Sequence, residues 1–101
     1  MALTSYISSD GNQLTINVTG QFNFSVYRQF REACQQAAAP KTSYVIDLQG
    51  TEYMDSSALG MLLLLRERSG GDAADIRITH CGPEIRKIFA IANFDRLFQI
   101  A

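Results

Sequence analysis

The stretch SYVIDLQGTEYMDSSALGMLLLLRERSGG, residues 43–71, decides how the chain is expected to fold. Its first eight residues, 43–50, form a β-branched run that ends at a glycine, which is typical of a buried strand. Asp55, Ser56 and Ser57 follow, and all three belong to the residue types that cap helix N-termini. A nearly unbroken apolar run comes next and ends at a Gly-Gly pair. We therefore predict a strand that passes into a helix, with an aspartate and two serines at the start of that helix.

The segments before this stretch predict a hairpin and a first helix. Apolar and polar residues alternate over residues 13–19, which is the period of a half-exposed strand. Residues 3–7 supply a partner strand across a turn at residues 9–12. Between residues 24 and 39 the apolar positions recur at helical spacing, so we expect an amphipathic helix that Pro40 stops.

Downstream, residues 75–81 read as another strand, and Pro83 starts a third helix. The chain closes with residues 97–101, a last short strand or helix. Strands that are separated by helices require crossovers, and right-handed crossovers give a mostly parallel sheet. The predicted fold class is α/β: a single domain over residues 1–101, with an N-terminal hairpin and then β-α-β-α-β-α around a mixed, mostly parallel sheet.

Composition excludes several classes of protein. With 101 residues, 47% hydrophobic and 19% charged, the chain reads as one soluble globular domain. The net charge is −1 and the nine Lys and Arg residues are scattered, which argues against nucleic acid as a partner. No signal peptide or apolar run of membrane-spanning length occurs, so we expect a cytoplasmic protein without a membrane partner. Cys34 and Cys81 are far apart in sequence and are expected to be free thiols.

A helical wheel of the second helix separates two faces. At 100° per residue, one face is an apolar wedge suited to cover the sheet, made of Ala58, Leu59, Leu62 and Leu65. The other begins with Ser56, holds Gly60 in mid-helix and turns Leu64 and Met61 outward. A mid-helix glycine costs about 1 kcal/mol relative to alanine. We interpret this face as a docking surface, where Gly60 allows close approach and Leu64 or Met61 enters a pocket. The alternatives are a simple helix cap and a solitary exposed leucine.

The sequence offers little for catalysis, and no cofactor or metal is expected. The single histidine, His80, lies near a strand end beside Cys81, without a G-x-S-x-G motif or a third ligand cluster. A dinucleotide fingerprint is also lacking. A receiver domain, the other small α/β phospho-switch, is a weaker alternative, because Asp47 lies inside its strand and Lys41 and Lys87 flank helices.

The segment VIDLQGTEYMDSSALGMLLLL resembles the signature of STAS domains, specifically stand-alone bacterial anti-sigma factor antagonists. In these an IDL-type strand leads through a loop to D-S-[ST]-[GA]-L-G and an apolar helix. The resemblance implies a regulator that binds an anti-sigma factor or switch kinase and so frees a sigma factor. It also implies inactivation by phosphorylation of the first serine after the aspartate, here Ser56 beside Asp55, and reactivation by a phosphatase. Ala58 stands where many members have glycine. In GQFNF many members have an acidic residue after the glycine, which leaves any contact of Gln21 or Asn23 with a partner open.

We therefore expect a phosphorylation-gated binding protein that is not an enzyme. The expected site consists of a phosphorylated Ser56, the neighbours Asp55 and Ser57, and the partner-binding residues Gly60, Met61 and Leu64. The alternative is a constitutive STAS subunit of a transporter or stressosome-like assembly, in which Ser56 is only a cap.

Overall fold

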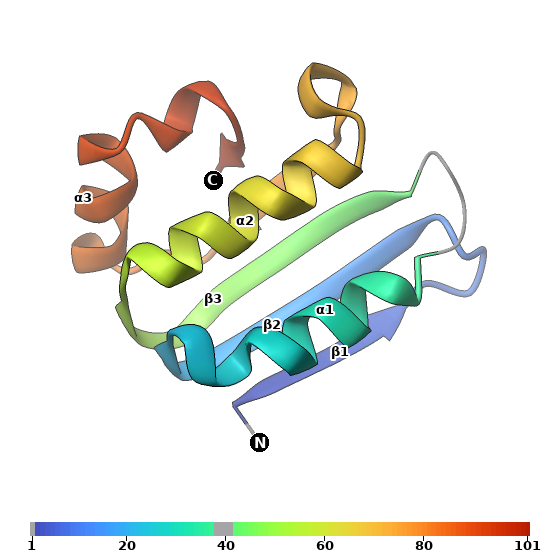
Figure 1. The fold of residues 1–101 in the computed structure, drawn as a ribbon, viewed down its shortest axis with the longest axis horizontal. Helices are drawn as coiled ribbons and strands as arrows, with labels where there is room; N and C mark the ends of the chain where they lie inside the picture. Colours follow the sequence, from blue (N-terminus) through green and yellow to red (C-terminus); the bar gives the residue numbers. More distant parts are fainter. Residues whose placement is uncertain (1, 38–41) are drawn as a thin grey trace.

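The computed structural model describes residues 2–37 and 42–101 (Figure 1). The strands and helices alternate along the chain much as the sequence predicts. In chain order they are β1 (Leu3–Ile7), β2 (Gln13–Phe22), the 3-10 turn η1 (Phe24–Val26), α1 (Tyr27–Gln35), β3 (Ser43–Met54), α2 (Ser56–Arg68), η2 (Gly71–Ala73), β4 (Ile76–Thr79), α3 (Pro83–Ile91), η3 (Phe94–Arg96) and β5 (Gln99–Ile100).

The five strands form one mixed sheet in the order β1-β2-β3-β4-β5. β1 pairs with β2 in an antiparallel hairpin, and the three other pairs are parallel. This confirms the predicted α/β class and the mostly parallel sheet. The last residues, left open as strand or helix, form the short edge strand β5.

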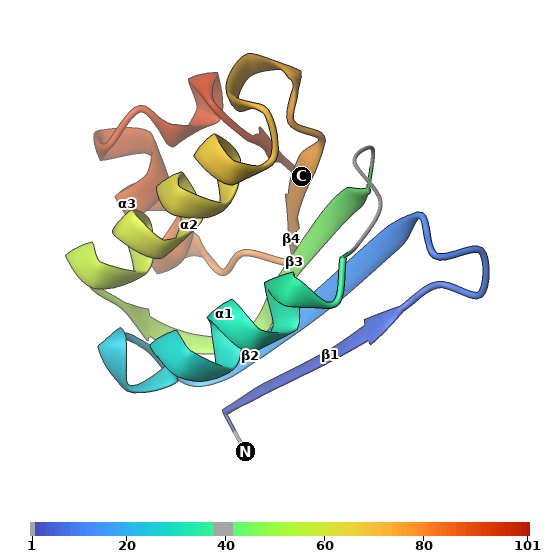
Figure 2. The same ribbon diagram turned by 45° about the vertical axis from the view of Figure 1, so that its right-hand side comes forward.

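The core lies between one face of the sheet and the helices. Figures 1 and 2 show α1 and α2 side by side across this face. The strand side chains beneath them are almost wholly buried: Leu14, Ile16, Val18, Ile46, Leu48, Ile76 and Ile78. The residues in between point to the other face, which is mainly polar and includes Thr4, Asn17, Asp47 and Arg77. One face of the sheet is therefore buried, and the helices pack against it.

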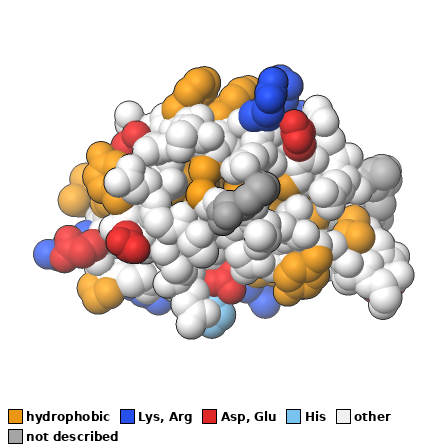
Figure 3. All heavy atoms as spheres, turned by 90° about the horizontal axis from the view of Figure 1, so that it is seen from below, with side chains coloured by type: hydrophobic (Ala, Val, Ile, Leu, Met, Phe, Trp, Pro, Cys, Tyr) orange, Lys and Arg blue, Asp and Glu red, His pale blue; other side chains and the backbone are white. Residues whose placement is uncertain are grey.

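Charges of both signs are interspersed on the surface. In the view from below, hydrophobic side chains form only small, separate patches among them (Figure 3). Within the described part of the chain, no helix has the length and apolar character needed to cross a membrane.

The first helix is shorter than predicted. The helical spacing began at residue 24, but residues Phe24–Val26 form a 3-10 turn and α1 begins at Tyr27. It ends at Gln35, so the expectation that it runs to residue 39 is wrong. The N–H groups of Gln36 and Ala37 donate to carbonyls three residues back, which tightens and closes the last turn. Pro40, the expected stop, lies outside the described residues.

β3 is longer than predicted and leaves no loop before α2. Its pairing with β2 continues past Gly50 to the pair Phe22 and Met54, because two register shifts in the pairing absorb the irregularity. One shift lies next to Gly20, whose φ of 73° favours glycine. The buried Thr51 hydroxyl also donates to the Val18 carbonyl at 2.8 Å. The strand therefore delivers its end directly to the first turn of α2.

Candidate functional site

Asp55 caps the N-terminus of α2. Its backbone is extended, and its Oδ1 accepts hydrogen bonds from the backbone N–H groups of Ser57 at 3.0 Å and Ala58 at 3.2 Å. The Ser57 hydroxyl donates to the same oxygen at 2.6 Å. This hydroxyl, followed by the two backbone donors, holds the pKa of Asp55 below its ordinary value. Ser57 and Asp55 therefore form one capping unit, and the hypothesis that Ser56 is the cap is wrong.

Ser56 is the first residue of α2, and its side chain is exposed. Across residues 2–37 and 42–101, no hydrogen bond uses its hydroxyl. The N-terminal turn of a helix presents unpaired N–H groups and the positive end of the helix dipole. Ser56 thus places an unengaged nucleophilic oxygen where a negative charge is favoured.

The end of β2 lies next to this turn. The Asp55 N–H donates to the Phe22 carbonyl at 3.4 Å, which holds the two strand ends together. Asn23 follows at once, and its Oδ1 accepts from the N–H of Ser25 at 2.9 Å and from the Ser25 hydroxyl at 2.6 Å. Its Nδ2 donates to Gln21 Oε1 at 3.3 Å. Gln21 and Asn23 therefore lie at the same edge of the sheet as Asp55.

The outer face of α2 is open and partly apolar. A Cβ added to Gly60 would meet nothing within 4 Å, so this glycine leaves space above the helix. Leu64, one turn further on, is 52% exposed, as the wheel predicts. Leu63 is 38% exposed, and the sequence interpretation missed it although the same wheel puts it beside Ser56. We call Ser56, Gly60, Leu63 and Leu64 the outer face of α2.

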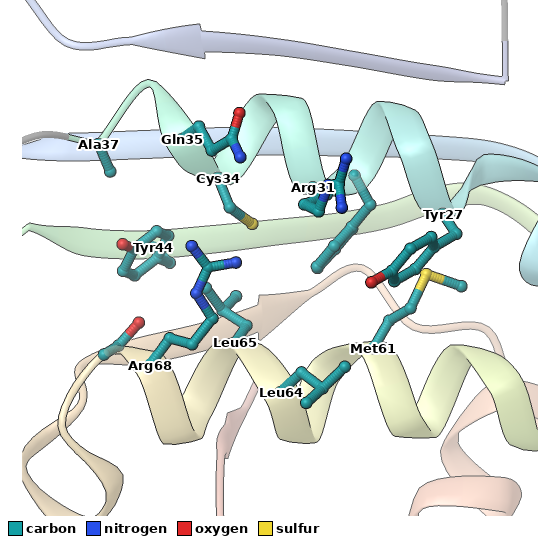
Figure 4. Close-up of a pocket in the computed structure, with 12 residues that line it drawn as sticks. Tyr27, Arg31, Cys34, Gln35, Ala37, Tyr44, Met61, Leu64, Leu65 and Arg68 are labelled. Carbon is teal, nitrogen blue, oxygen red and sulfur yellow. The ribbon is translucent and has the colours of Figure 1, made fainter.

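Met61 does not point outward as expected, because its side chain is only 3% exposed. It lies near Tyr27, across the junction of α2 with α1 (Figure 4). The wheel considered burial against the sheet alone and not against a neighbouring helix. The predicted core residues Ala58, Leu62 and Leu65 are buried, and Leu59 is partly buried against the same core.

His80 contacts Asp47 on the adjacent strand. Its Nδ1 lies 3.1 Å from Asp47 Oδ1, and its side chain is 62% exposed. Among the described residues, no three His, Cys, Asp or Glu side chains come together as a metal-binding group would require. Cys34 and Cys81 are free thiols, as predicted.

One relative shares the full length of the chain. A STAS-domain containing protein of Pseudomonas aeruginosa (strain UCBPP-PA14), PA14_20770, is 50% identical over 101 residues, which is 100% of both chains.

Three similar solved structures are of anti-sigma factor antagonists. The structure of SpoIIAA in its unphosphorylated form aligns with a TM-score of 0.73 and 19% identity over 99% of this chain and 87% of that one. The phosphorylated form of this Bacillus protein aligns with a TM-score of 0.70 and 18% identity, over 99% and 91%. The STAS domain of an anti-sigma factor antagonist from Rhodobacter sphaeroides is 31% identical over 77% of this chain and 84% of that one, with a TM-score of 0.54.

A family model extends over nearly the whole domain. Residues 5–99 match the model described as "Mlab, STAS domain". The match includes most of the hairpin, the capped start of α2 and the last helix. The chain belongs to the STAS domain family.

Proposed function

We propose that this protein is an anti-sigma factor antagonist whose binding is gated by phosphorylation of Ser56. In this function the unphosphorylated protein sequesters an anti-sigma factor or switch kinase and so frees a sigma factor, and a phosphatase restores it after phosphorylation. The family and the likeness to antagonists support the general role. The proposal places the protein in the cytoplasm, together with these partners, and gives it no catalytic activity of its own.

The observation that carries the proposal is the division of labour among three adjacent side chains. Asp55 caps the helix and Ser57 donates to Asp55, whereas the exposed Ser56 hydroxyl is used for neither purpose. A kinase could therefore modify Ser56 without removing any hydrogen bond that holds the first turn. Modification of Ser57 would instead remove the donor that contributes most to the low pKa of Asp55.

Phosphorylation should leave the free protein folded. The phosphoryl group adds about −1.5 to −2 charges. The N-terminal end of a helix stabilises an anion by about 0.3–1 kcal/mol. Solvent at an exposed first turn screens much of the repulsion from Asp55.

A docked partner changes this balance. The outer face of α2 offers Gly60 for close approach and two exposed leucines, Leu63 and Leu64, as apolar contacts. A partner pressed onto this face would strip water from the phosphate, and a buried charge without a partner costs several kcal/mol. A penalty of about 3–4 kcal/mol weakens binding roughly 10²–10³-fold. Met61, being buried, is not part of the proposed contact surface.

Mass spectrometry of protein isolated from its native host tests the proposal. We expect a species heavier by one phosphoryl group, and peptide mapping should place that group on Ser56. The Ser57→Ala variant should still accept it, whereas Ser56→Ala should not. Phosphate on Ser57 would overturn the assignment. A protein that binds its partner but is never phosphorylated would favour the constitutive subunit instead.

A further inference from the structure

A groove of about 570 Å³ lies between α1 and α2, on the side of α2 where Met61 is buried (Figure 4). Its apolar lining includes Phe30, Met61 and Leu65, each at most 4% exposed. Cys34 also lines it, and burial raises the pKa of this thiol to about 11, so the thiol is uncharged at neutral pH. The base of the groove is therefore apolar and uncharged, and polar residues line much of the rest of it.

Among the described lining residues, two arginines carry the only formal charges at neutral pH. Arg31 comes from α1 and Arg68 from α2, and both line the groove. The Arg68 side chain extends from α2 toward α1 (Figure 4). Arg31 lies over the Tyr27 ring, 5.9 Å from its centroid. Within the described part of the chain, neither guanidinium forms an ion pair with a carboxylate. A guanidinium presents a planar fork of donors that matches a carboxylate or a phosphate.

The dimensions of the groove favour a narrow ligand. The lining residues extend over eight residue steps of each helix, from Tyr27 to Gln35 and from Met61 to Ser69. At 1.5 Å per residue this is about 12 Å. A two-turn helix of this length is about 10 Å across, so only part of its width could enter the groove. An extended hydrocarbon chain is narrow enough to lie within the groove along its length.

We propose that the groove binds a single-chain anionic amphiphile, namely a medium-length fatty acid. The acyl chain lies on the floor formed by Phe30, Met61 and Leu65, and the carboxylate accepts hydrogen bonds from Arg31 and Arg68. Charge complementarity and the apolar floor carry this assignment. It does not depend on phosphorylation of Ser56.

Calorimetric titration of the purified full chain tests the proposal, with decanoate below its micellar concentration as the probe. Decanoate should bind saturably at one site. Decyltrimethylammonium has the same chain and the opposite charge, and it should bind at least about tenfold more weakly. The variants Arg31→Gln and Arg68→Gln should each weaken decanoate binding about tenfold or more, because each removes a charge-assisted hydrogen bond. Arg28→Gln is the matched control, since Arg28 lies on α1 but does not line the groove.

The two free thiols supply a second measurement that locates the ligand. Cys34 lines the groove and Cys81 does not. Decanoate should slow alkylation of Cys34 by N-ethylmaleimide and leave Cys81 unchanged, read by mass spectrometry of the two peptides. Any of four results would overturn the proposal: no saturable binding, equal affinity for the cationic chain, equal loss in Arg28→Gln, or binding of an acidic amphipathic peptide in place of decanoate.

Discussion

α1 and α2 lie side by side on the same face of the sheet, but their outer faces differ (Figure 2). α1 turns Arg28 and Glu32 outward, which are the residue types expected where a helix meets water. In the corresponding position α2 exposes Leu63 and Leu64 and has open space above Gly60. Hydration explains the outer face of α1. It does not explain that of α2, where a glycine and two leucines contribute little to folding.

The two helices also differ in how their first turns are capped. Val26, the residue before α1, provides no side-chain cap, and the nearest cap is Asn23 at the start of η1, which accepts two hydrogen bonds from Ser25. α2 begins after Asp55, whose carboxylate is held by three donors. The helix with the more apolar outer face, α2, therefore has the more extensively hydrogen-bonded cap. Ser56 lies on the first turn of α2 and forms no part of that cap. The contrast is the one expected if α2 carries the proposed binding surface on a firmly capped helix.

The largest expected effect is a loss of stability from a substitution in the buried face of α2, which leaves its outer face unchanged. Leu62→Ala should lower the free energy of unfolding by about 2–5 kcal/mol, because it removes most of a fully buried side chain and leaves a cavity. Leu64→Ala removes a half-exposed side chain and should cost less than about 1 kcal/mol. Chemical denaturation of both variants measures the difference. If Leu64→Ala were the more damaging of the two, the inner and outer faces of α2 would be wrongly assigned.

A substitution at Gly60 should have the opposite pattern of effects, because it should weaken partner binding without lowering stability. Gly60→Gln should raise stability by up to about 1 kcal/mol, since glutamine is a better helix former and open space receives its side chain. The same side chain should obstruct a partner that approaches the outer face closely. Thermal melts and a binding assay with the cognate anti-sigma factor measure the two effects. Unchanged affinity would remove Gly60 from the interface.

The smallest effect concerns the anchoring of the first turn at low pH. The pKa of Asp55 is lower in the folded chain than its ordinary value, so its ionised form stabilises the fold. This contribution is fully present above about pH 4 and is lost as the pH falls through the lowered pKa. The stability difference between wild type and Asp55→Asn should therefore shrink in acid.

Ser57→Ala provides the control, because the Ser57 hydroxyl is the largest cause of the low pKa. In this variant the pKa of Asp55 should rise toward its ordinary value, as NMR titration of the carboxyl carbon would show. An unchanged pKa would mean that the backbone donors alone hold the carboxylate.

Much of this arrangement could be predicted from local patterns. Alternation over β2, the cap residues before α2 and Pro83 at the start of α3 are local signals, and each led to the correct element. The order of these elements then led to the correct sheet. Exposure of Leu64 followed from helical periodicity for the same reason.

The errors arose where contacts distant in sequence decide the outcome. Met61 is buried because α1 lies beside α2, and a wheel of a single helix contains no such neighbour. β3 extends to Met54 because β2 continues to pair with it through two register shifts. The separate roles of Ser56 and Ser57 depend on which hydroxyl reaches Asp55, and two adjacent serines look alike in sequence.

The central claim is that one charge on Ser56 blocks partner binding without disturbing the fold. The most direct measurement is the affinity of wild type, Ser56→Asp and Ser56→Ala for the cognate anti-sigma factor, with circular dichroism of each variant. We predict near-native spectra for all three, retained affinity for Ser56→Ala, and binding of Ser56→Asp weakened toward the roughly 10²–10³-fold loss expected for a trapped charge. A Ser56→Asp variant that is folded and binds as tightly as wild type would contradict the account.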